Sequence, residues 1–165
     1  MDGKKVAIIG AGGASRAVGA GLMNIGVSSI ELYDTNLESA IDTAKILTKT
    51  NDANIIITAK SISELSLKDV GIMVNANPVG MYPNVDQCAI NIDHLNDVDK
   101  NGIVFDLIYR PHETLLLKEA SKKGLKTYNG IEMLVQQGAK ALELWTNKAV
   151  PVDIMRNNLI DALKQ

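Results

Sequence analysis

The sequence contains little cysteine, no long apolar run and no block of like charges. Cys88 is the single cysteine, so no internal disulfide can form, which indicates a reducing compartment. We interpret Cys88 as an ordinary thiol because no histidine stands in a pairing context with it. No apolar stretch reaches the ~18 residues of a membrane span, and MDGKKVAIIG lacks a signal-peptide hydrophobic region. These absences predict a soluble, cytoplasmic protein with no membrane partner.

The sequence also lacks a large excess of either positive or negative charge. Lys and Arg together number 17 and Asp and Glu 19, for a net charge of -2, and no basic run of five residues occurs. This balance gives no field that would hold a polyanion, so we exclude nucleic acid as a partner. A chain of 165 residues with 46% hydrophobic residues is long enough for one domain with its own core.

Short apolar runs of strand length alternate with segments of helical period along the chain. Because a strand buried on both faces reads as an unbroken apolar run, this alternation predicts a parallel sheet with right-handed crossovers. The expected strands are Val6–Ile9, Ser29–Tyr33, Asn54–Thr58, Ile72–Asn75, Ile103–Asp106 and Lys126–Tyr128. The fold class is α/β, a Rossmann-type doubly wound sheet of order 3-2-1-4-5-6 with helices on both faces.

The expected helices have apolar stripes that would face the sheet. They cover residues after the glycine turn to about Ile25, then Leu37–Thr50, Thr114–Lys123, Ile131–Trp145 and Val152–Leu163, with a short helical turn or loop at Ser61–Leu65 and a loop at 76–91. The stripe of the second helix is Leu37, Ile41, Ala44 and Leu47, and that of the fourth includes Leu142 and Trp145. The last helix is expected to bury Val152, Met155, Leu159 and Leu163.

A glycine-rich turn follows the first strand and opens a helix. Its residues are Gly10, Ala11, Gly12, Gly13, Ala14 and Ser15. Gly10 permits the tight turn, and Gly12 leaves room for a diphosphate to approach the backbone, which the free N–H groups at the helix start would hold. Ser15 replaces the usual Gly or Ala, and its hydroxyl could donate to a phosphate oxygen. A turn that serves only the tight strand-to-helix connection is the alternative.

Asp34 stands at the end of the second strand, where dinucleotide-binding folds place a ribose-binding carboxylate. A carboxylate there accepts from both ribose hydroxyls and repels a 2′-phosphate, because like charges a few ångströms apart cost on the order of 1–4 kcal/mol. An NADP-binding site normally offers arginine next, but Thr35 and Asn36 follow here. The sequence therefore predicts NAD as the preferred cofactor. Asp34 could also serve as a turn residue or as the N-cap of the helix at 37–50.

Three later stretches narrow the family. They are Asn75-Ala76-Asn77-Pro78-Val79-Gly80-Met81, then Val104-Phe105-Asp106-Leu107-Ile108-Tyr109-Arg110-Pro111, then Tyr128-Asn129-Gly130-Ile131-Glu132-Met133-Leu134-Val135-Gln136-Gln137-Gly138-Ala139. Together with the glycine turn, they resemble the shikimate dehydrogenase family, including its quinate/shikimate members. The resemblance runs from Lys4 to about Met155. It implies reversible hydride transfer between a nicotinamide cofactor and shikimate, quinate or their 3-dehydro forms.

The resemblance also implies roles for individual residues. Gly10, Ala11, Gly12, Gly13 and Ala14 would hold the diphosphate, and Asp34 and Thr35 the adenosine ribose. Ala76, Asn77 and Pro78 would pass beneath the cofactor, Leu107 would pack beside the nicotinamide, and Gly130 would approach it closely. Tyr109 and Gln137 would contact substrate. Many family members have Thr where this chain has Asn77, and the NADP-using members commonly have Asn-Arg-Thr at the ribose position.

The catalytic Lys and Asp of the resembled family, with its Ser-x-Ser motif, lie on a separate N-terminal domain that these 165 residues do not match. We therefore assign no catalytic residue and no metal site, and expect a piece of a two-domain enzyme that is inactive alone. Residues 1–165 would form one domain, with 131–165 as helices that face the absent domain and promote self-association. A stand-alone NAD-binding sensor is one alternative, and a methyltransferase that uses S-adenosylmethionine is another.

Overall fold

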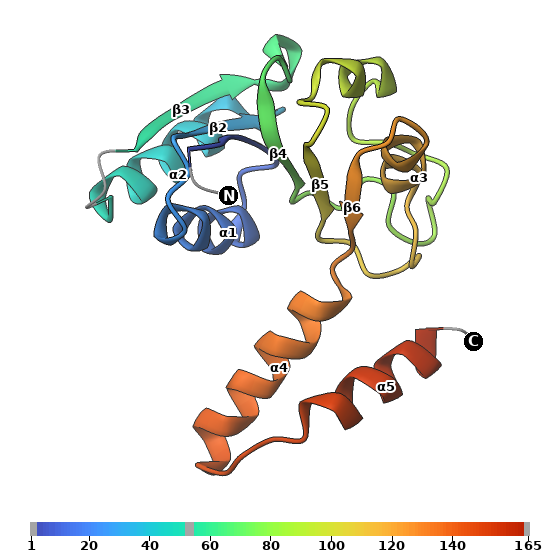
Figure 1. Cartoon of the computed structure of the whole chain (residues 1–165). Helices are drawn as coiled ribbons and strands as arrows, with labels where there is room; N and C mark the ends of the chain where they lie inside the picture. Colours follow the sequence, from blue (N-terminus) through green and yellow to red (C-terminus); the bar gives the residue numbers. More distant parts are fainter. Residues whose placement is uncertain (1–2, 52–54, 164–165) are drawn as a thin grey trace.

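A computed structural model describes residues 3–51 and 55–163 of the chain (Figure 1). Its six strands form one sheet of order β3-β2-β1-β4-β5-β6, and every neighbouring pair is parallel. The predicted fold class is thereby confirmed. The strands are β1 Lys5–Ile9, β2 Ser29–Asp34, β3 Ile56–Ser61, β4 Val70–Asn75, β5 Ile103–Asp106 and β6 Lys126–Tyr128.

Successive side chains of the central strands point to opposite faces of the sheet, and each face has its own hydrophobic core. Val6 and Ile8 of β1 join the core beneath α1 (Gly13–Asn24) and α2 (Leu37–Lys49). Ala7 and Ile9 join the core on the opposite face, which includes residues of α3 (Leu115–Lys122) and of the 3₁₀ segment η2 (Ile92–Asp97). Burial on both faces explains why these strands read as unbroken apolar runs.

The third strand is the strand whose bounds differ most from the sequence prediction. It runs from Ile56 to Ser61 rather than over 54–58, and Asn54 lies outside the described residues. The short helical turn or loop expected at Ser61–Leu65 is present as the 3₁₀ turn η1 (Ile62–Glu64), which is closed by a capping box in which Ser61 and Glu64 exchange hydrogen bonds. The predicted loop at 76–91 is present, but η2 after it was not expected. η2 is short and mostly polar, so it gave no period to detect.

The buried face of α2 matches the predicted stripe only in part. Leu47 is buried and Ala44 packs against the core as expected, whereas Leu37 and Ile41 are exposed. Ala40 and Thr43 are buried instead, on the side of the helix that meets the glycine turn. Thr43 uses this position to hydrogen-bond the turn, as described below.

The last two helices, α4 (Ile131–Thr146) and α5 (Val152–Leu163), form a hairpin that projects away from the sheet (Figure 1). Only the start of α4 is packed against the body of the domain. The predicted stripe on α4 is therefore wrong at its far end, where Trp145 is 81% exposed. The prediction for α5 was also wrong, because the four apolar residues expected to be buried are only half-buried. Two helices packed only on each other cannot enclose a core.

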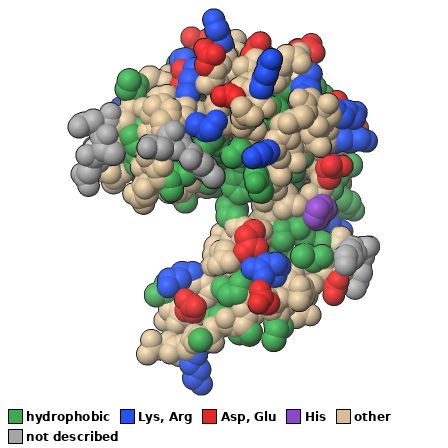
Figure 2. Space-filling model, in the orientation of Figure 1, with side chains coloured by type: hydrophobic (Ala, Val, Ile, Leu, Met, Phe, Trp, Pro, Cys, Tyr) green, Lys and Arg blue, Asp and Glu red, His purple; other side chains and the backbone are tan. Residues whose placement is uncertain are grey.

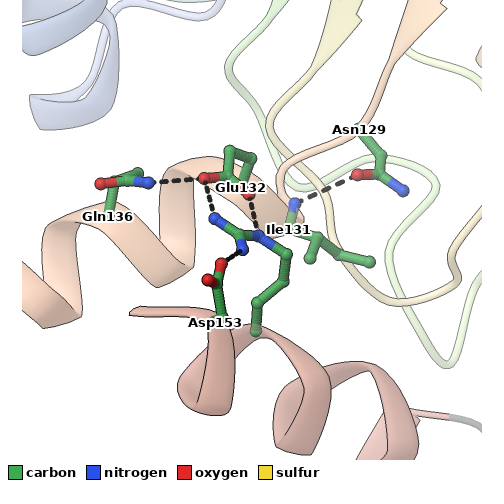
Figure 3. A network of polar contacts seen from close by, with 6 residues as sticks. Asn129, Ile131, Glu132, Gln136 and Asp153 are labelled. Atoms are coloured by element: carbon green, nitrogen blue, oxygen red, sulfur yellow. Dashed lines mark hydrogen bonds and ion pairs between the residues drawn. The ribbon is translucent and has the colours of Figure 1, made fainter. Parts of the chain in front are cut away.

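A polar network holds the hairpin together (Figure 3). The Arg156 guanidinium of α5 donates to both Glu132 carboxylate oxygens of α4, at 2.7 and 2.9 Å, and also to Asp153. Gln136 donates to Glu132 as well, at 2.6 Å. These bonds lower the pKa of Glu132 to about 2, so the carboxylate is ionised at neutral pH.

Across residues 3–51 and 55–163, no helix has the length and apolar character needed to span a bilayer.

Candidate functional site

The glycine turn joins β1 to α1 at the carboxyl edge of the sheet, as predicted. Gly10 has a φ of 104°, and a Cβ there would lie 2.9 Å from the Ala76 carbonyl oxygen, so only glycine fits. Gly12 precedes α1, with nothing within 4 Å of the place where its Cβ would stand. Gly12, Gly13 and Ala14 are exposed. The start of α1 is thus open to an anion, which the helix N-terminus would attract.

Asp34 links the glycine turn to the turn after β2. Its Oδ2 accepts from the Ala11 N–H at 2.7 Å, and its Oδ1 accepts from the Asn36 N–H at 2.8 Å. Asn36, not Asp34, is the N-cap of α2, because its side chain accepts from the Glu38 and Ser39 N–H groups. Of the roles considered for Asp34, the turn role is therefore present and the cap role is not. The Thr35 hydroxyl also donates to Oδ1 of Asp34, at 3.3 Å. A carboxylate has about four acceptor positions, so Asp34 retains one for a ligand, and a second if the exposed Thr35 hydroxyl turns away.

Two buried hydroxyl groups support the glycine turn from below. Ser15 is fully buried and donates to the Gly10 carbonyl at 2.7 Å, so the expectation that its hydroxyl reaches a phosphate is wrong. Thr43 of α2 is also fully buried and donates to the Ala11 carbonyl at 2.7 Å. Sequence reasoning missed Thr43. The available signal was a hydroxyl residue at helical spacing from Ala40 and Leu47, on the face of α2 that is buried.

A second buried network fixes the carboxyl ends of β4 and β5. Asp106 accepts from the Asn75 amide at 2.9 Å, from the Thr114 hydroxyl at 2.6 Å and from the Ile108 N–H at 3.1 Å. Burial raises the pKa of Asp106, and these three donors oppose that effect. Asp106 thus stabilises the turn that follows β5. The network positions the loops that begin at Ala76 and Leu107.

A pocket of about 310 Å³ opens at this edge, between the glycine turn, the end of β2 and the loop after β4. Five predicted residues line it, namely Gly10, Asp34, Thr35, Asn77 and Pro78. Tyr33, Ile62, Val79 and Ala89 also line it and were not predicted as site residues. Ile62 and Ala89 come from segments whose spatial position the sequence does not reveal. Ala11 and Ala76 do not line the pocket: Ala11 is buried, and the Ala76 N–H donates to the Ile9 carbonyl at 2.8 Å.

The remaining predicted residues do not line the pocket; they are Gly12, Gly13, Ala14, Leu107, Tyr109, Gly130 and Gln137. A Cβ on Gly130 would stand 1.9 Å from the Leu107 carbonyl oxygen, so this glycine closely approaches the backbone after β5. Leu107 is buried, whereas Tyr109 and Gln137 are exposed, and neither of the last two lines the pocket. Cys88 is half-buried, and burial raises the pKa of its thiol. Among the described residues, no cluster of His, Cys, Asp or Glu could hold a metal ion.

Sheet order, glycine turn and edge pocket together define a Rossmann-type domain. A family model described as "Shikimate 5'-dehydrogenase C-terminal domain" matches residues 130–159. The chain is 37% identical over 166 residues to the shikimate dehydrogenase (NADP(+)) of Methanosarcina barkeri, covering 99% of this chain and 58% of that relative. The chain belongs to the shikimate dehydrogenase family and matches the C-terminal part of these enzymes.

Solved structures agree with this assignment. A shikimate dehydrogenase in complex with NADP+ superposes with a TM-score of 0.86 and 34% identity, over 100% of this chain and 56% of that one. A shikimate 5-dehydrogenase from Listeria monocytogenes, in complex with shikimate and NAD, gives a TM-score of 0.82 and 31% identity, over 96% and 56%. The chain thus spans little more than half the length of the relatives it matches.

Proposed function

We propose that the chain is the cofactor-binding domain of a shikimate or quinate/shikimate dehydrogenase and binds a nicotinamide dinucleotide at the carboxyl edge of its sheet. The observation that carries the proposal is the Asp34 carboxylate, held between the glycine turn and the turn after β2 at the wall of the pocket. The diphosphate of a dinucleotide would find N–H donors at the glycine turn, and its adenosine ribose would find an acceptor in Asp34.

The residues present fit such a cofactor. The space above Gly12 admits a diphosphate, which the free N–H groups of Gly13 and Ala14 at the start of α1 would bind. Asp34 would accept from the ribose hydroxyls, with Thr35 beside it. Ala76, Asn77 and Pro78 would support the cofactor from the loop after β4. When bound, the nicotinamide supplies the hydride acceptor or donor of an alcohol–ketone reaction.

We further propose that NAD is preferred to NADP, although the relative from Methanosarcina barkeri is named for NADP(+). No Lys or Arg lines the 310 Å³ pocket, and the carboxylate of Asp34 does. A 2′-phosphate would therefore meet a negative charge with no cation to offset it. The Listeria monocytogenes enzyme, which is in complex with NAD, supports the proposal from a related chain.

The first prediction tests this preference by calorimetry. The unaltered chain should bind NAD at least about tenfold more tightly than NADP, because charge repulsion of about 1.4 kcal/mol or more is a factor of ten. Asp34→Asn removes an acceptor of charge-assisted hydrogen bonds, so NAD affinity should fall roughly 10- to 100-fold while the preference over NADP narrows. Asp42→Asn, on the exposed face of α2, removes the same charge away from the pocket and should change neither affinity. Equal affinities in the unaltered chain would contradict the proposal.

Leu107 and Gly130 would flank the nicotinamide, and Tyr109 and Gln137 would contribute the substrate contacts of this domain.

Hydride transfer from an alcohol also needs a group that accepts the hydroxyl proton. Lys60, near the end of β3, does not fit this role. Its ammonium lies 2.9 Å from Glu31, a contact that raises the pKa of Lys60 and keeps it protonated.

The second prediction is that residues 1–165, purified alone, bind the cofactor without turning over substrate. Incubation with NAD and either shikimate or quinate should give no NADH absorbance above the enzyme-free control. Calorimetry on the same sample shows that the cofactor site is intact, so a null result cannot be attributed to misfolding. Clear NADH formation would mean that these residues include a proton acceptor and would overturn this part of the proposal.

A further inference from the structure

Asn75 and Asp106 are buried polar residues at the carboxyl ends of β4 and β5, and none of the ligand contacts proposed above uses either side chain. Asn75 is 1% exposed and Asp106 0%. The two residues are partners in the parallel register of these strands, and the Asn75 amide donates to Asp106 at 2.9 Å. Burial of an amide and a carboxylate costs free energy unless their donors and acceptors are used. The other partners of the pair therefore show what it holds in place.

Asn75 bonds to both of the loops that begin at this edge. In the loop after β4, its Oδ1 accepts from the Asn77 N–H at 3.4 Å, and its amide donates to the Asn77 carbonyl at 3.5 Å. In the loop after β5, its main-chain carbonyl accepts from the Leu107 N–H at 3.0 Å. The two bonds to Asn77 are long, but they come from one side chain whose direction Asp106 fixes. One residue thus sets the spacing between Asn77 and Leu107.

Asp106 extends the same set of contacts to Gly130. It accepts from the Ile108 N–H at 3.1 Å, and the Ile108 carbonyl accepts from the Gly130 N–H at 3.0 Å. Gly130 lies between β6 and α4, where the surface narrows toward the hairpin (Figure 2). Thr114, the N-cap of α3, donates to the other carboxylate oxygen of Asp106 at 2.6 Å. Asp106 therefore also serves a helix that has no proposed contact with the cofactor.

We propose that Asn75 is a positioning residue for the nicotinamide end of the cofactor. The inference rests on the proposed function, in which Leu107 and Gly130 flank the nicotinamide and Asn77 supports the cofactor. Asn75 does not touch the cofactor. It holds the two loops at a fixed spacing before the ligand arrives, so that binding does not have to order them. The adenosine end is held separately, by the hydrogen bonds of Asp34, so loss of the Asn75 side chain affects only the nicotinamide half.

The test compares NAD with ADP-ribose, which has the same adenosine and diphosphate but lacks the nicotinamide. Calorimetry on the unaltered chain should show that NAD binds more tightly than ADP-ribose. Asn75→Ala should weaken NAD binding at least about fivefold and ADP-ribose binding less than about twofold. A substitution that only destabilised the fold would not separate the two ligands. Asn75→Ser serves the same test should the alanine variant not fold, because its hydroxyl is too short to reach Asp106 but keeps a polar group at the site.

Thr114→Val is the matched control. It removes another hydrogen bond of Asp106, and also the bond that Thr114 accepts from the Leu117 N–H at 3.4 Å, so urea unfolding should show a loss of stability similar to that of Asn75→Ala. The bonds of Asn75 remain, so the affinities for NAD and ADP-ribose should not change.

Three results would overturn the proposal. They are equal affinities of the unaltered chain for NAD and ADP-ribose, equal losses of both affinities in Asn75→Ala, and the same selective loss of NAD affinity in Thr114→Val. Binding of neither ligand by the unaltered chain would overturn the proposed function itself, and this inference with it.

Discussion

Gly130→Ala will destabilise the domain by about 3 kcal/mol or more, near the upper end for overpacking substitutions. The added Cβ would lie 1.9 Å from the Leu107 carbonyl oxygen and 2.5 Å from its carbon. Backbone atoms cannot rotate away as a flexible side chain can. The Gly130 N–H also bonds the Ile108 carbonyl at 3.0 Å, so a shift of this residue would break the connection between β5 and α4. Urea unfolding followed by circular dichroism measures the change.

Gly21→Ala is the matched control for this substitution. Gly21 lies inside α1, does not have a positive φ, and has no neighbouring atom within 4 Å of the place where a Cβ would stand. Alanine there should stabilise the helix by roughly 0.8–1.0 kcal/mol. If Gly130→Ala unfolded at the same urea concentration as the unaltered chain, the close packing of the β5 and α4 backbones would be contradicted.

Gly12→Ala will weaken NAD binding at least about 100-fold, or about 2.8 kcal/mol, without changing the stability of the fold. The backbone of Gly12 is extended and its Cβ position is open, so alanine fits the domain itself. The methyl group would instead stand where the diphosphate approaches the N–H groups of α1. Calorimetry with NAD and thermal unfolding of the same sample separate the two effects.

The outcome of Gly12→Ala distinguishes a binding turn from a purely structural one. A turn that only connects β1 to α1 would tolerate alanine at this position with no change in any property. Gly21→Ala serves again as the control and should bind NAD like the unaltered chain. NAD affinity that survives Gly12→Ala would place the diphosphate elsewhere.

The sequence predicted the sheet well because burial on both faces leaves an unmistakable apolar run. The runs at Val6–Ile9, Ile72–Asn75 and Ile103–Asp106 all lie within observed strands. β3 was harder, because it is an edge strand with the partly polar sequence IITAKS, in which no residue is fully buried. Because β3 has a neighbouring strand on one side only, its sequence is less uniformly apolar and its hydrophobic pattern is harder to detect.

The candidate site was predictable where chemistry depends on local sequence and not where it depends on packing. Gly10 directly follows β1 and Asp34 is the last residue of β2, so their place at the carboxyl edge could be deduced. Thr43 was missed because the inward face of α2 is set by contact with the glycine turn rather than by hydrophobic period. Trp145 was misplaced for a related reason, since an apolar stripe does not reveal whether anything covers it.

The most direct test of the account is an NMR titration of the ¹⁵N-labelled chain with NAD. The amide signals of residues 10–14, 34–36 and 76–79 should shift together, while those of α5 should not. S-adenosylmethionine should leave the same signals unchanged. Shifts confined to other segments, or no response to NAD at concentrations that saturate related dehydrogenases, would contradict a dinucleotide site at this edge of the sheet.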